Sequence, residues 1–358
     1  MPEKPRFDFY NSIRFKPDAF LRAPEPEPTH RFSIMTGTSN EQLADDIAAI
    51  LGTTALRSVN PIDPETGRPK RFADGEPNIQ IPDNVRDQNV YIIHPTSPSF
   101  DDHSVNDHYM ELVGMADAAH KSSAKDITAV IPYYGYSRSD RKDKPRVPIM
   151  ASLSAKMLEA AGIDRMMIVD IHSEQFTGFP SIPTDILYAR PVFEKMLRER
   201  GLTNVIAVTP DEGGLKRARN YYQRLPADGL AVMFKDHRVD KTNESEVIDM
   251  IGDVDGKIAM IFDDMIDSAR THVNAANHLV HEGGALEAYL VATHGIFSPG
   301  ALERIDDSPI TKVFVTDTIR PRQDVLAHPK IEIISIAPLL AEAIKRRQKG
   351  ESISELLQ

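Results

Sequence analysis

The 358-residue chain contains no cysteine and no tryptophan, and its 42 Lys and Arg residues are outnumbered by 53 Asp and Glu residues. Without cysteine the protein can form no disulfide and offers no thiolate, so any metal must be bound by oxygen or imidazole ligands. The net charge of −11 argues against broad, nonspecific binding to nucleic acid, but it permits a local basic site for a phosphorylated small molecule. The absence of cysteine fits a cytoplasmic location, which we expect for this protein.

Long hydrophobic runs are also lacking. No apolar stretch approaches the roughly 20 residues that a membrane-spanning helix requires. The N-terminal stretch MPEKPRFDFYNSIRF has no apolar segment of the kind found in signal peptides. Residues 1–30 end in APEPEPTH, and because alternating prolines block both helix and central strand, we expect an extended N-terminal arm there.

Beyond the arm, short apolar runs alternate with helical patterns. The first run, RFSIMTG, precedes a helical pattern in which Ser39 and Gln42 have capping-box spacing and Gly52 suits the position after the helix end. Strands that are apolar on both faces and alternate with helices indicate a mostly parallel sheet that is covered on each side. We therefore predict an α/β fold with two domains, residues 31–183 and 184–330, followed by a C-terminal helical segment, residues 331–358.

The most distinctive polar segment is IFDDMIDSART, residues 261–271. Asp263 and Asp264 stand at the end of an apolar run, and Ser268 and Thr271 follow in a loop of small residues. Ligands of parallel α/β sheets bind at the carboxyl ends of strands. Paired acids there can bind the cis-diol of a ribose or a hard cation, and the loop can surround a phosphate at a helix N-terminus. The alternative is a capped helix after a surface turn.

Three further segments place polar residues after apolar runs. The segment YGYSRSDRKDKPR contains Arg138, Arg141, Lys142, Lys144 and Arg146. Its position favours phosphate binding over a solvated basic face. VDIHSEQ ends a predicted strand with Asp170 and His172, which could take part in a metal site. Gly213 and Gly214 in TPDEGG either allow the backbone to approach a ligand closely or form a tight turn.

Together these segments resemble the ribose-phosphate pyrophosphokinase family, also called phosphoribosyl pyrophosphate synthetases. IFDDMIDSART resembles the ribose-5-phosphate loop of the phosphoribosyltransferase fold, and RFADGE, YGYSRSDRKDKPR, DIHSEQFTGF, TPDEGGLKRAR, VATHGIFS and VTDTI match further family segments in order. The similarity covers nearly everything beyond the arm. It implies two phosphoribosyltransferase-like (Rossmann-like) domains, with the first on the ATP side and the second on the ribose-5-phosphate side.

The resemblance also implies roles for individual residues. ATP would be bound by Phe72, Asp74, Glu76, Arg138, Ser139 and Asp140. Ribose 5-phosphate would be bound by Asp263, Asp264, Asp267, Ser268, Ala269, Arg270 and Thr271. His172 and Asp211 would contact the cofactor magnesium (Mg²⁺).

The implied reaction transfers the β,γ-diphosphoryl group of ATP to O1 of ribose 5-phosphate and gives phosphoribosyl pyrophosphate and AMP. Family members carry a catalytic Lys and Arg two residues apart on a loop after a strand. Here Lys235 fits the lysine, His237 stands two residues further on, and Arg238 follows directly. Either His237 or Arg238 could fill the second catalytic position, although an imidazole is only partly charged near neutral pH.

Three positions depart from the family pattern. Ser139 stands where Gln is typical, His237 stands in the catalytic register, and Arg270 stands where Gly is usual. Two alternatives therefore stay open: a paralogue acting on a larger ribosyl 5-phosphate ester such as ADP-ribose, with Arg270 on its extra phosphate, or a non-catalytic regulatory subunit of a synthetase complex. A base phosphoribosyltransferase is disfavoured, because RFADGE and the basic segment belong to the ATP-using branch. We also expect a homo-oligomer of dimers, up to a hexamer, with no nucleic-acid or membrane partner.

Overall fold

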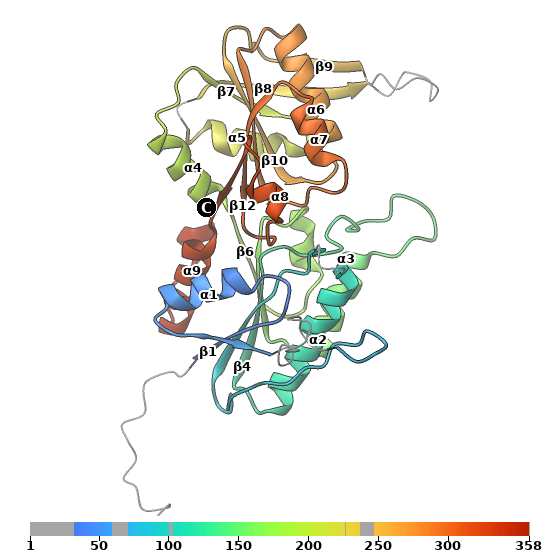
Figure 1. Ribbon diagram of the computed structural model, residues 1–358, viewed down its shortest axis with the longest axis vertical. Coiled ribbons are helices and arrows are strands. Elements are labelled where there is room, and N and C mark those ends of the chain that lie inside the picture. The colour runs from blue at the N-terminus through green and yellow to red at the C-terminus, as the bar shows by residue number, and fades with distance from the viewer. Residues whose placement is uncertain (1–31, 59–70, 100–102, 226, 237–246, 358) are drawn as a thin grey trace, which may run out of the picture.

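Two β-sheets organise the fold. The computed structural model describes residues 32–58, 71–99, 103–225, 227–236 and 247–357. The sheets lie in two lobes that are stacked along the long axis of the molecule, with helices packed against both (Figure 1). The expected N-terminal arm lies outside the described residues.

The first sheet has six strands in the order β2-β1-β3-β4-β5-β6, and all of its strand pairs are parallel. Its strands are β1 (Phe32–Thr36), β2 (Ala55–Arg57), β3 (Asn89–Ile93), β4 (Asp126–Ile131), β5 (Arg165–Val169) and β6 (Thr184–Leu187). The helices of this part of the chain are α1 (Glu41–Ile50), α2 (Val105–Lys121), α3 (Met150–Ala160) and the short 3₁₀ helix η2 (Glu174–Gly178).

The second sheet has seven strands in the order β13-β12-β11-β10-β7-β8-β9. Its strands are β7 (Val205–Thr209), β8 (Ala227–Asp236), β9 (Val247–Ile251), β10 (Ile258–Ile266), β11 (Glu287–Gly295), β12 (Ile310–Thr316) and β13 (Ile331–Ile334). Only β8 and β9 pair antiparallel among these described strands. The helices are α4 (Arg190–Glu199), η3 (Glu212–Gly214), α5 (Leu215–Tyr222), α6 (Arg270–Asn277), the π-helical η4 (His278–Glu282), α7 (Ala301–Asp306), α8 (Gln323–Leu326), α9 (Ala337–Lys349) and η5 (Ser354–Leu357).

Apolar strands explain why helices cover both faces of these sheets. Every residue of β7 is buried, and in β4 every residue after Asp126 is buried. Strands of this kind must pack on both faces, which requires a helical layer on each side. The predicted α/β class, with two mostly parallel sheets flanked by helices, is therefore confirmed.

The first helix begins one residue later than its sequence pattern suggests. The expected capping box at Ser39 and Gln42 does not form, because Asn40 occupies the N-cap and its side chain accepts the backbone N–H of Leu43 at 3.3 Å. The hydroxyl of Ser39 instead lies 3.0 Å from Nδ1 of His94. Gly52, with a φ of 70°, follows the helix end as expected.

The sheets cross both of the expected domain boundaries. The boundary between residues 183 and 184 falls before β6, which pairs with β5, so the first sheet extends to Leu187. The boundary at residue 331 separates β13 from β12, although the two strands pair in the second sheet. By its strand pairing, β6 belongs to the first domain and β13 to the second.

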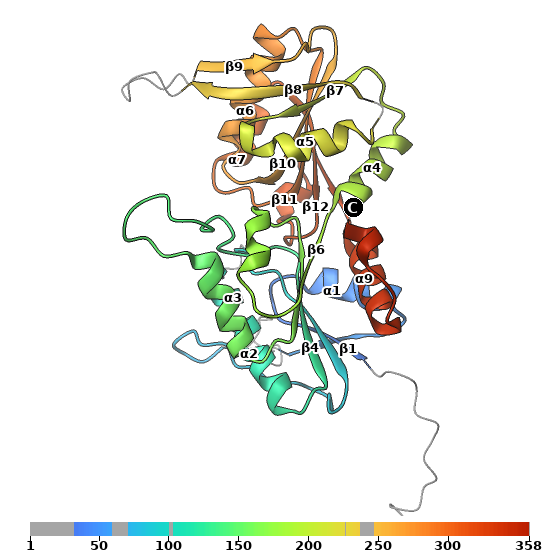
Figure 2. The same cartoon turned by 180° about the vertical axis from the view of Figure 1, so that it is seen from behind.

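Helix α9 returns to the first lobe and lies beside α1 (Figures 1 and 2). Leu340 and Ile344 of α9 share one buried core with Leu43 and Ile47 of α1. Nε of Arg347, at the end of α9, also donates to the hydroxyl of Thr128 in β4 at 3.2 Å. The first lobe is thus completed by residues that follow the second lobe in sequence.

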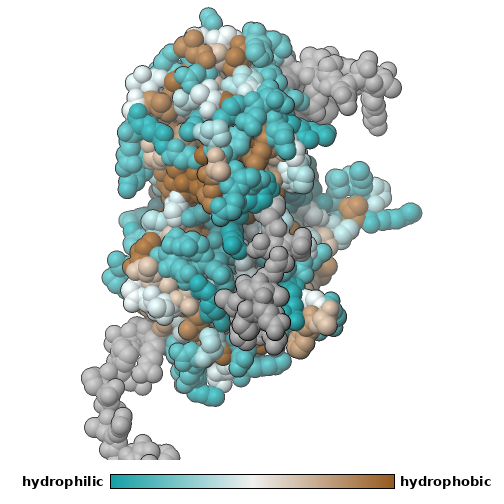
Figure 3. All heavy atoms as spheres, viewed as in Figure 1, coloured by the Kyte–Doolittle hydropathy of each residue, from teal (hydrophilic) through white to brown (hydrophobic). Residues whose placement is uncertain are grey.

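Hydrophilic residues predominate on the face shown in Figure 3, and hydrophobic residues occur there in smaller groups. None of the helices that the structure describes combines the length and the apolar content needed to cross a bilayer. The cytoplasmic location stays a prediction.

Candidate active site

A cavity of about 990 Å³ lies between the two lobes. It is lined in the first lobe by segments that follow β4 and β5, and in the second lobe by the segment after β7 and by the end of β10 with its following loop. Because parallel α/β sheets bind ligands at the carboxyl ends of their strands, this is the expected position for a substrate site. Of the predicted site residues, the cavity brings together Arg138, Ser139, Asp140, His172, Asp211, Asp263, Asp264, Asp267, Ser268, Ala269, Arg270 and Thr271.

Asp263 and Asp264 are neighbours in sequence, but each carboxylate has its own histidine. Nδ1 of His172, from the first lobe, lies 2.7 Å from Oδ2 of Asp264. Nε2 of His272, from α6, lies 2.8 Å from Oδ2 of Asp263. Arg217 in α5 contacts both acids, with its Nη1 3.0 Å from Asp263 and 3.6 Å from Asp264. These partners offset the repulsion between the two carboxylates.

The two carboxylates differ in acidity. Burial raises the pKa of Asp263, and the hydrogen bond with His272 opposes this effect only in part. Burial acts in the same direction on Asp264, but the hydrogen bond from His172 and the charge of Arg217 outweigh it and hold the pKa of Asp264 below its ordinary value. The same hydrogen bond raises the pKa of His172. Asp264 therefore carries the more permanent negative charge of the pair.

The loop after β10 has the geometry of an anion site. Ala269 adopts a left-handed backbone conformation, with a φ of 61°, and occupies the N-cap of α6. Since alanine has no side-chain acceptor, it leaves the first backbone N–H groups of α6 available to a ligand. Nη1 of Arg304 in α7 donates to the carbonyl of Ser268 at 2.9 Å and thereby holds the loop in place. Arg270 is exposed and also lines the cavity.

An ion pair connects the two sides of the cavity. Nη1 of Arg138, which follows β4, lies 2.7 Å from Oδ2 of Asp267, which follows β10. The hydroxyl of Ser298 donates to the other carboxylate oxygen of Asp267. The basic segment that we expect to bind ATP phosphates thus touches the loop that we expect to bind ribose 5-phosphate. Such proximity is what a transfer between two bound substrates requires.

The expected metal ligands, His172 and Asp211, both line the cavity. Within the part of the chain that the structure describes, no three metal-binding side chains form a cluster that could hold an ion. Mg²⁺ usually keeps several waters and is bound by one or two side chains together with substrate phosphates. The two residues therefore fit a magnesium ion that arrives with a polyphosphate better than an ion held by the protein alone.

Comparison with known proteins agrees with this arrangement. A family model described as the N-terminal domain of ribose phosphate pyrophosphokinase matches residues 32–162, and one described as the phosphoribosyl synthetase-associated domain matches residues 240–358. Ribose-phosphate pyrophosphokinase of Aquifex aeolicus (strain VF5) is 45% identical over 327 residues, which cover 90% of this chain and 98% of that protein. The chain belongs to the ribose-phosphate pyrophosphokinase family.

Other members of the ribose-phosphate pyrophosphokinase family match over the same span. The protein of that name from Helicobacter hepaticus (strain ATCC 51449 / 3B1) is 41% identical over 325 residues, covering 91% of this chain and 98% of its own. The crystal structure of phosphoribosylpyrophosphate synthetase from Mycobacterium smegmatis matches with a TM-score of 0.78 at 32% identity, covering 89% of this chain and 99% of that chain. The resemblance stated from the sequence is therefore confirmed.

The turn that the family pattern assigns to adenine lies away from the cavity. Phe72 is 55% exposed, and neither it nor Asp74 or Glu76 lines the cavity. The carboxylate of Asp74 accepts the backbone N–H of Glu76 at 3.1 Å, which closes the turn on itself. Within one chain, these three expected ATP-binding residues are not brought to the other site residues.

The expected catalytic residues are only partly described. Lys235 belongs to β8, but its side chain is not among the described groups, and His237 and Arg238 lie outside the described residues. Their catalytic roles stay predictions.

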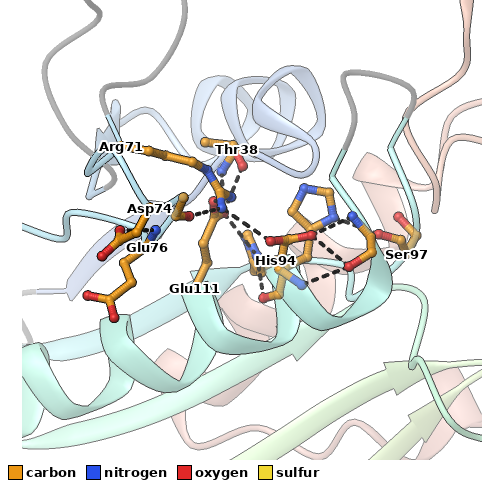
Figure 4. A network of polar contacts seen from close by, with 11 residues as sticks. Thr38, Arg71, Asp74, Glu76, His94, Ser97 and Glu111 are labelled. Carbon is orange, nitrogen blue, oxygen red and sulfur yellow. Dashed lines mark hydrogen bonds and ion pairs between the residues drawn. The ribbon is translucent and has the colours of Figure 1, made fainter.

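A buried polar cluster fixes the turn around Phe72 to α2 (Figure 4). Arg71 pairs with Oε1 of Glu111 at 2.8 Å and also donates to the carbonyl of Gly75 at 2.8 Å. Oε2 of Glu111 accepts the hydroxyl of Thr38 at 2.7 Å, and the side chain of Glu111 is fully buried. The exposed turn is therefore held by an ion pair whose acidic member has no contact with solvent.

His94 in this cluster makes the stability of the protein depend on pH. Burial lowers the pKa of His94 to about 4, whereas an unfolded chain has its usual value near 6.5. The unfolded state therefore binds a proton first as the pH falls, so stability is lost between pH 6.5 and 4, by roughly 3 kcal/mol. We expect His94→Gln, which keeps a hydrogen-bonding side chain but cannot titrate, to flatten this part of the curve.

Urea unfolding of both proteins across this pH range measures the effect. Burial also lowers the pKa of His108, so some loss of stability on acidification stays in the variant. Parallel curves for the two proteins between pH 6.5 and 4 would contradict the assignment to His94.

Arg217 and His272, the two cavity side chains that contact Asp263, are missing from the set that we predicted. Arg217 lies in TPDEGGLKRAR, and a cation in the first turn of a helix beside a Gly-rich loop could have signalled contact with the acids. His272 directly follows the phosphate loop, and no spacing rule distinguishes it. Its role depends on α6 turning its side chain toward Asp263, which only the folded structure shows.

Proposed function

We propose that the protein is a ribose-phosphate diphosphokinase that transfers the β,γ-diphosphoryl group of ATP to O1 of ribose 5-phosphate. The observation that carries this proposal is the single cavity in which the basic segment after β4 meets the acidic phosphate loop after β10. Family relatives named ribose-phosphate pyrophosphokinase align with the chain over nearly their whole length, which supports the same activity here.

The loop after β10 would bind the acceptor substrate. The 5-phosphate would lie against the free N–H groups of α6 and the hydroxyls of Ser268 and Thr271. Asp263 and Asp264 would accept hydrogen bonds from the ribose hydroxyls. The sugar O1 would then point toward the first lobe, where it can attack the β-phosphorus of ATP.

The first lobe would bind the donor substrate. Arg138 would leave or share Asp267 in order to neutralise the ATP phosphates. Magnesium bound with those phosphates would be contacted by His172 and Asp211, and it would offset the negative charge that develops during transfer. Lys235, with either His237 or Arg238, would add positive charge to the transferred group.

The adenine turn supports assembly into a homo-oligomer. Its residues are exposed and do not reach the cavity of their own chain. In a dimer or a hexamer built from dimers, Phe72, Asp74 and Glu76 could meet ATP in the cavity of a neighbouring chain. Such an assembly would give these residues the ATP-binding role that their motif implies.

The function is tested by incubating the purified protein with Mg²⁺, ATP and either ribose 5-phosphate or ADP-ribose and then measuring AMP. We expect AMP with ribose 5-phosphate and none after chelation of the metal, because the polyphosphate charge would no longer be offset. AMP formation with ADP-ribose but not with ribose 5-phosphate would show that the acceptor is the larger ester. Folded protein that forms no AMP with either acceptor would show that the proposal is wrong.

A further inference from the structure

The carboxylate of Asp263 is held at both of its oxygens. Nη1 of Arg217 and the backbone N–H of Asp264 contact Oδ1 at 3.0 and 2.8 Å. Nε2 of His272 contacts Oδ2 at 2.8 Å, and the side chain of His272 is only 6% exposed. A carboxylate with donors on both oxygens cannot rotate freely, so its remaining lone pairs keep one orientation.

The surroundings of His272 determine which of its nitrogens carries the proton. Nδ1 is buried and has no hydrogen-bond partner among the described residues. A proton there would be a buried N–H without an acceptor, which is costly. The proton of the neutral ring therefore belongs on Nε2, where the carboxylate of Asp263 accepts it. The ring is a permanent donor to Asp263.

The histidine of the second acid differs in its surroundings. His172 comes from the first lobe and is 42% exposed, so it can turn toward a ligand or a metal. His272 comes from the helix that begins at the phosphate loop, and it is enclosed. The same α6 thus offers backbone N–H groups to a phosphate and orients the acid that faces the sugar.

We propose that His272 is a positioning residue that aims the Asp263 carboxylate at the ribose hydroxyls and so sets the preference for ribose over 2-deoxyribose in the acceptor. This inference rests on the proposed function, because it takes the ligand of the loop to be a sugar 5-phosphate. A carboxylate that is already oriented gains the most binding free energy from a ribose hydroxyl in a fixed position. It loses that hydrogen bond when 2-deoxyribose has no hydroxyl there. His272 acts through Asp263 and has no contact with the reacting atoms.

The experiment compares His272→Leu, which removes the donor at similar volume, with His272→Gln, whose amide can reach the position of Nε2. We expect His272→Leu to raise KM for ribose 5-phosphate about tenfold, which is the loss of one hydrogen bond to a charged group. The same variant should lose ribose preference, measured as the ratio of kcat/KM for ribose 5-phosphate to that for 2-deoxyribose 5-phosphate. KM for ATP should stay unchanged, and His272→Gln should restore most of the preference.

A matched control lies a few residues further along the same helical segment. Nδ1 of His278 pairs with Glu282 at 3.1 Å, outside the cavity lining. His278→Leu removes a comparable histidine–carboxylate contact and should leave both the KM for ribose 5-phosphate and the ribose preference as in the wild type. Urea midpoints of all variants show which of them are folded.

The outcomes separate this inference from the proposed function. Folded His272→Leu that keeps its ribose preference, or that loses kcat with KM unchanged, overturns the positioning role. If the wild type forms no AMP, calorimetric titration with ribose 5-phosphate and 2-deoxyribose 5-phosphate tests the same preference as a ratio of Kd values. Binding without turnover contradicts only the proposed function, whereas a wild type that binds neither sugar overturns both.

Discussion

Asp264→Asn is expected to lower kcat/KM for ribose 5-phosphate by at least about 100-fold. Asp264 is the acid whose pKa is held low, by His172 and Arg217 against the effect of burial, so it is ionised near neutral pH. Asparagine removes that charge and leaves Arg217 and His172 facing a neutral amide beside the substrate site. Steady-state AMP formation at varied ribose 5-phosphate measures the loss.

A double-mutant cycle shows whether the loss arises from the contact between the lobes. His172 and Asp264 come from different lobes and are 2.7 Å apart, so we expect Asp264→Asn and His172→Gln to couple by about 1.5 to 3 kcal/mol in transition-state binding. Asp253→Asn is the control, since Asp253 is 78% exposed and its ion pair with Lys257 lies on the surface. Additive effects of the two site variants, or a similar loss in the control, would contradict the role of Asp264.

Glu111→Gln should destabilise the protein by about 3 kcal/mol. The side chain of Glu111 is fully buried. Burial acts to raise its pKa, but the polar contacts of the carboxylate, among them the hydrogen bonds from Thr38, hold the pKa below its ordinary value, so the group is ionised. Glutamine removes the charge that Arg71 requires, and it places an amide donor among groups that already donate. The urea midpoint at neutral pH, followed by far-UV circular dichroism, measures this change.

The same helix provides the control for this variant. Asp117 in α2 pairs with Lys121 at 2.8 Å, but both side chains are well exposed. Asp117→Asn should therefore change the free energy of unfolding by less than about 0.5 kcal/mol. Equal midpoints for wild type and Glu111→Gln would show that the buried pair adds nothing to stability.

The longer strands could be predicted because their apolar runs leave few alternatives in an α/β chain. The strands that the apolar runs of the sequence do not reveal are the edge strands of the two sheets, β2, β6, β9 and β13. Within these four strands apolar residues occur at most two in a row, which gives no clear strand pattern, and β6 lies between prolines that resemble a linker. These segments form strands because each can pair with the free edge of a neighbouring strand, and that pairing depends on the tertiary structure.

The start of α1 shows the same limit in one pair of residues. Ser39 and Asn40 are both good N-cap residues, and the pattern favoured Ser39. The structure uses Ser39 to contact His94, and it uses the amide of Asn40 to donate to the carbonyl of Asp317 at 2.8 Å in the second lobe. Contacts with residues far away in the sequence therefore determine which of two equally suitable residues caps the helix.

The part of the site that could be predicted consists of residues that lie close together in one short segment. The acids lie near the end of β10 and the phosphate loop follows that strand, so the motif alone places Asp263, Asp264 and the loop together. Arg217 and His272 reach those acids from two different helices, and their directions depend on how α5 and α6 pack. The position of the Phe72 turn depends on the ion pair between Arg71 and Glu111, which no local pattern reveals.

The return of α9 to the first lobe has a consequence for how the protein is made. During translation, β1 to β6 are synthesised before any strand of the second lobe. Leu43 and Ile47 on α1 must then wait for Leu340 and Ile344, which emerge only after β13. Contacts of such long sequence separation form slowly, and the waiting apolar face is a target for chaperones. The lobe that begins the chain is therefore the last to be finished.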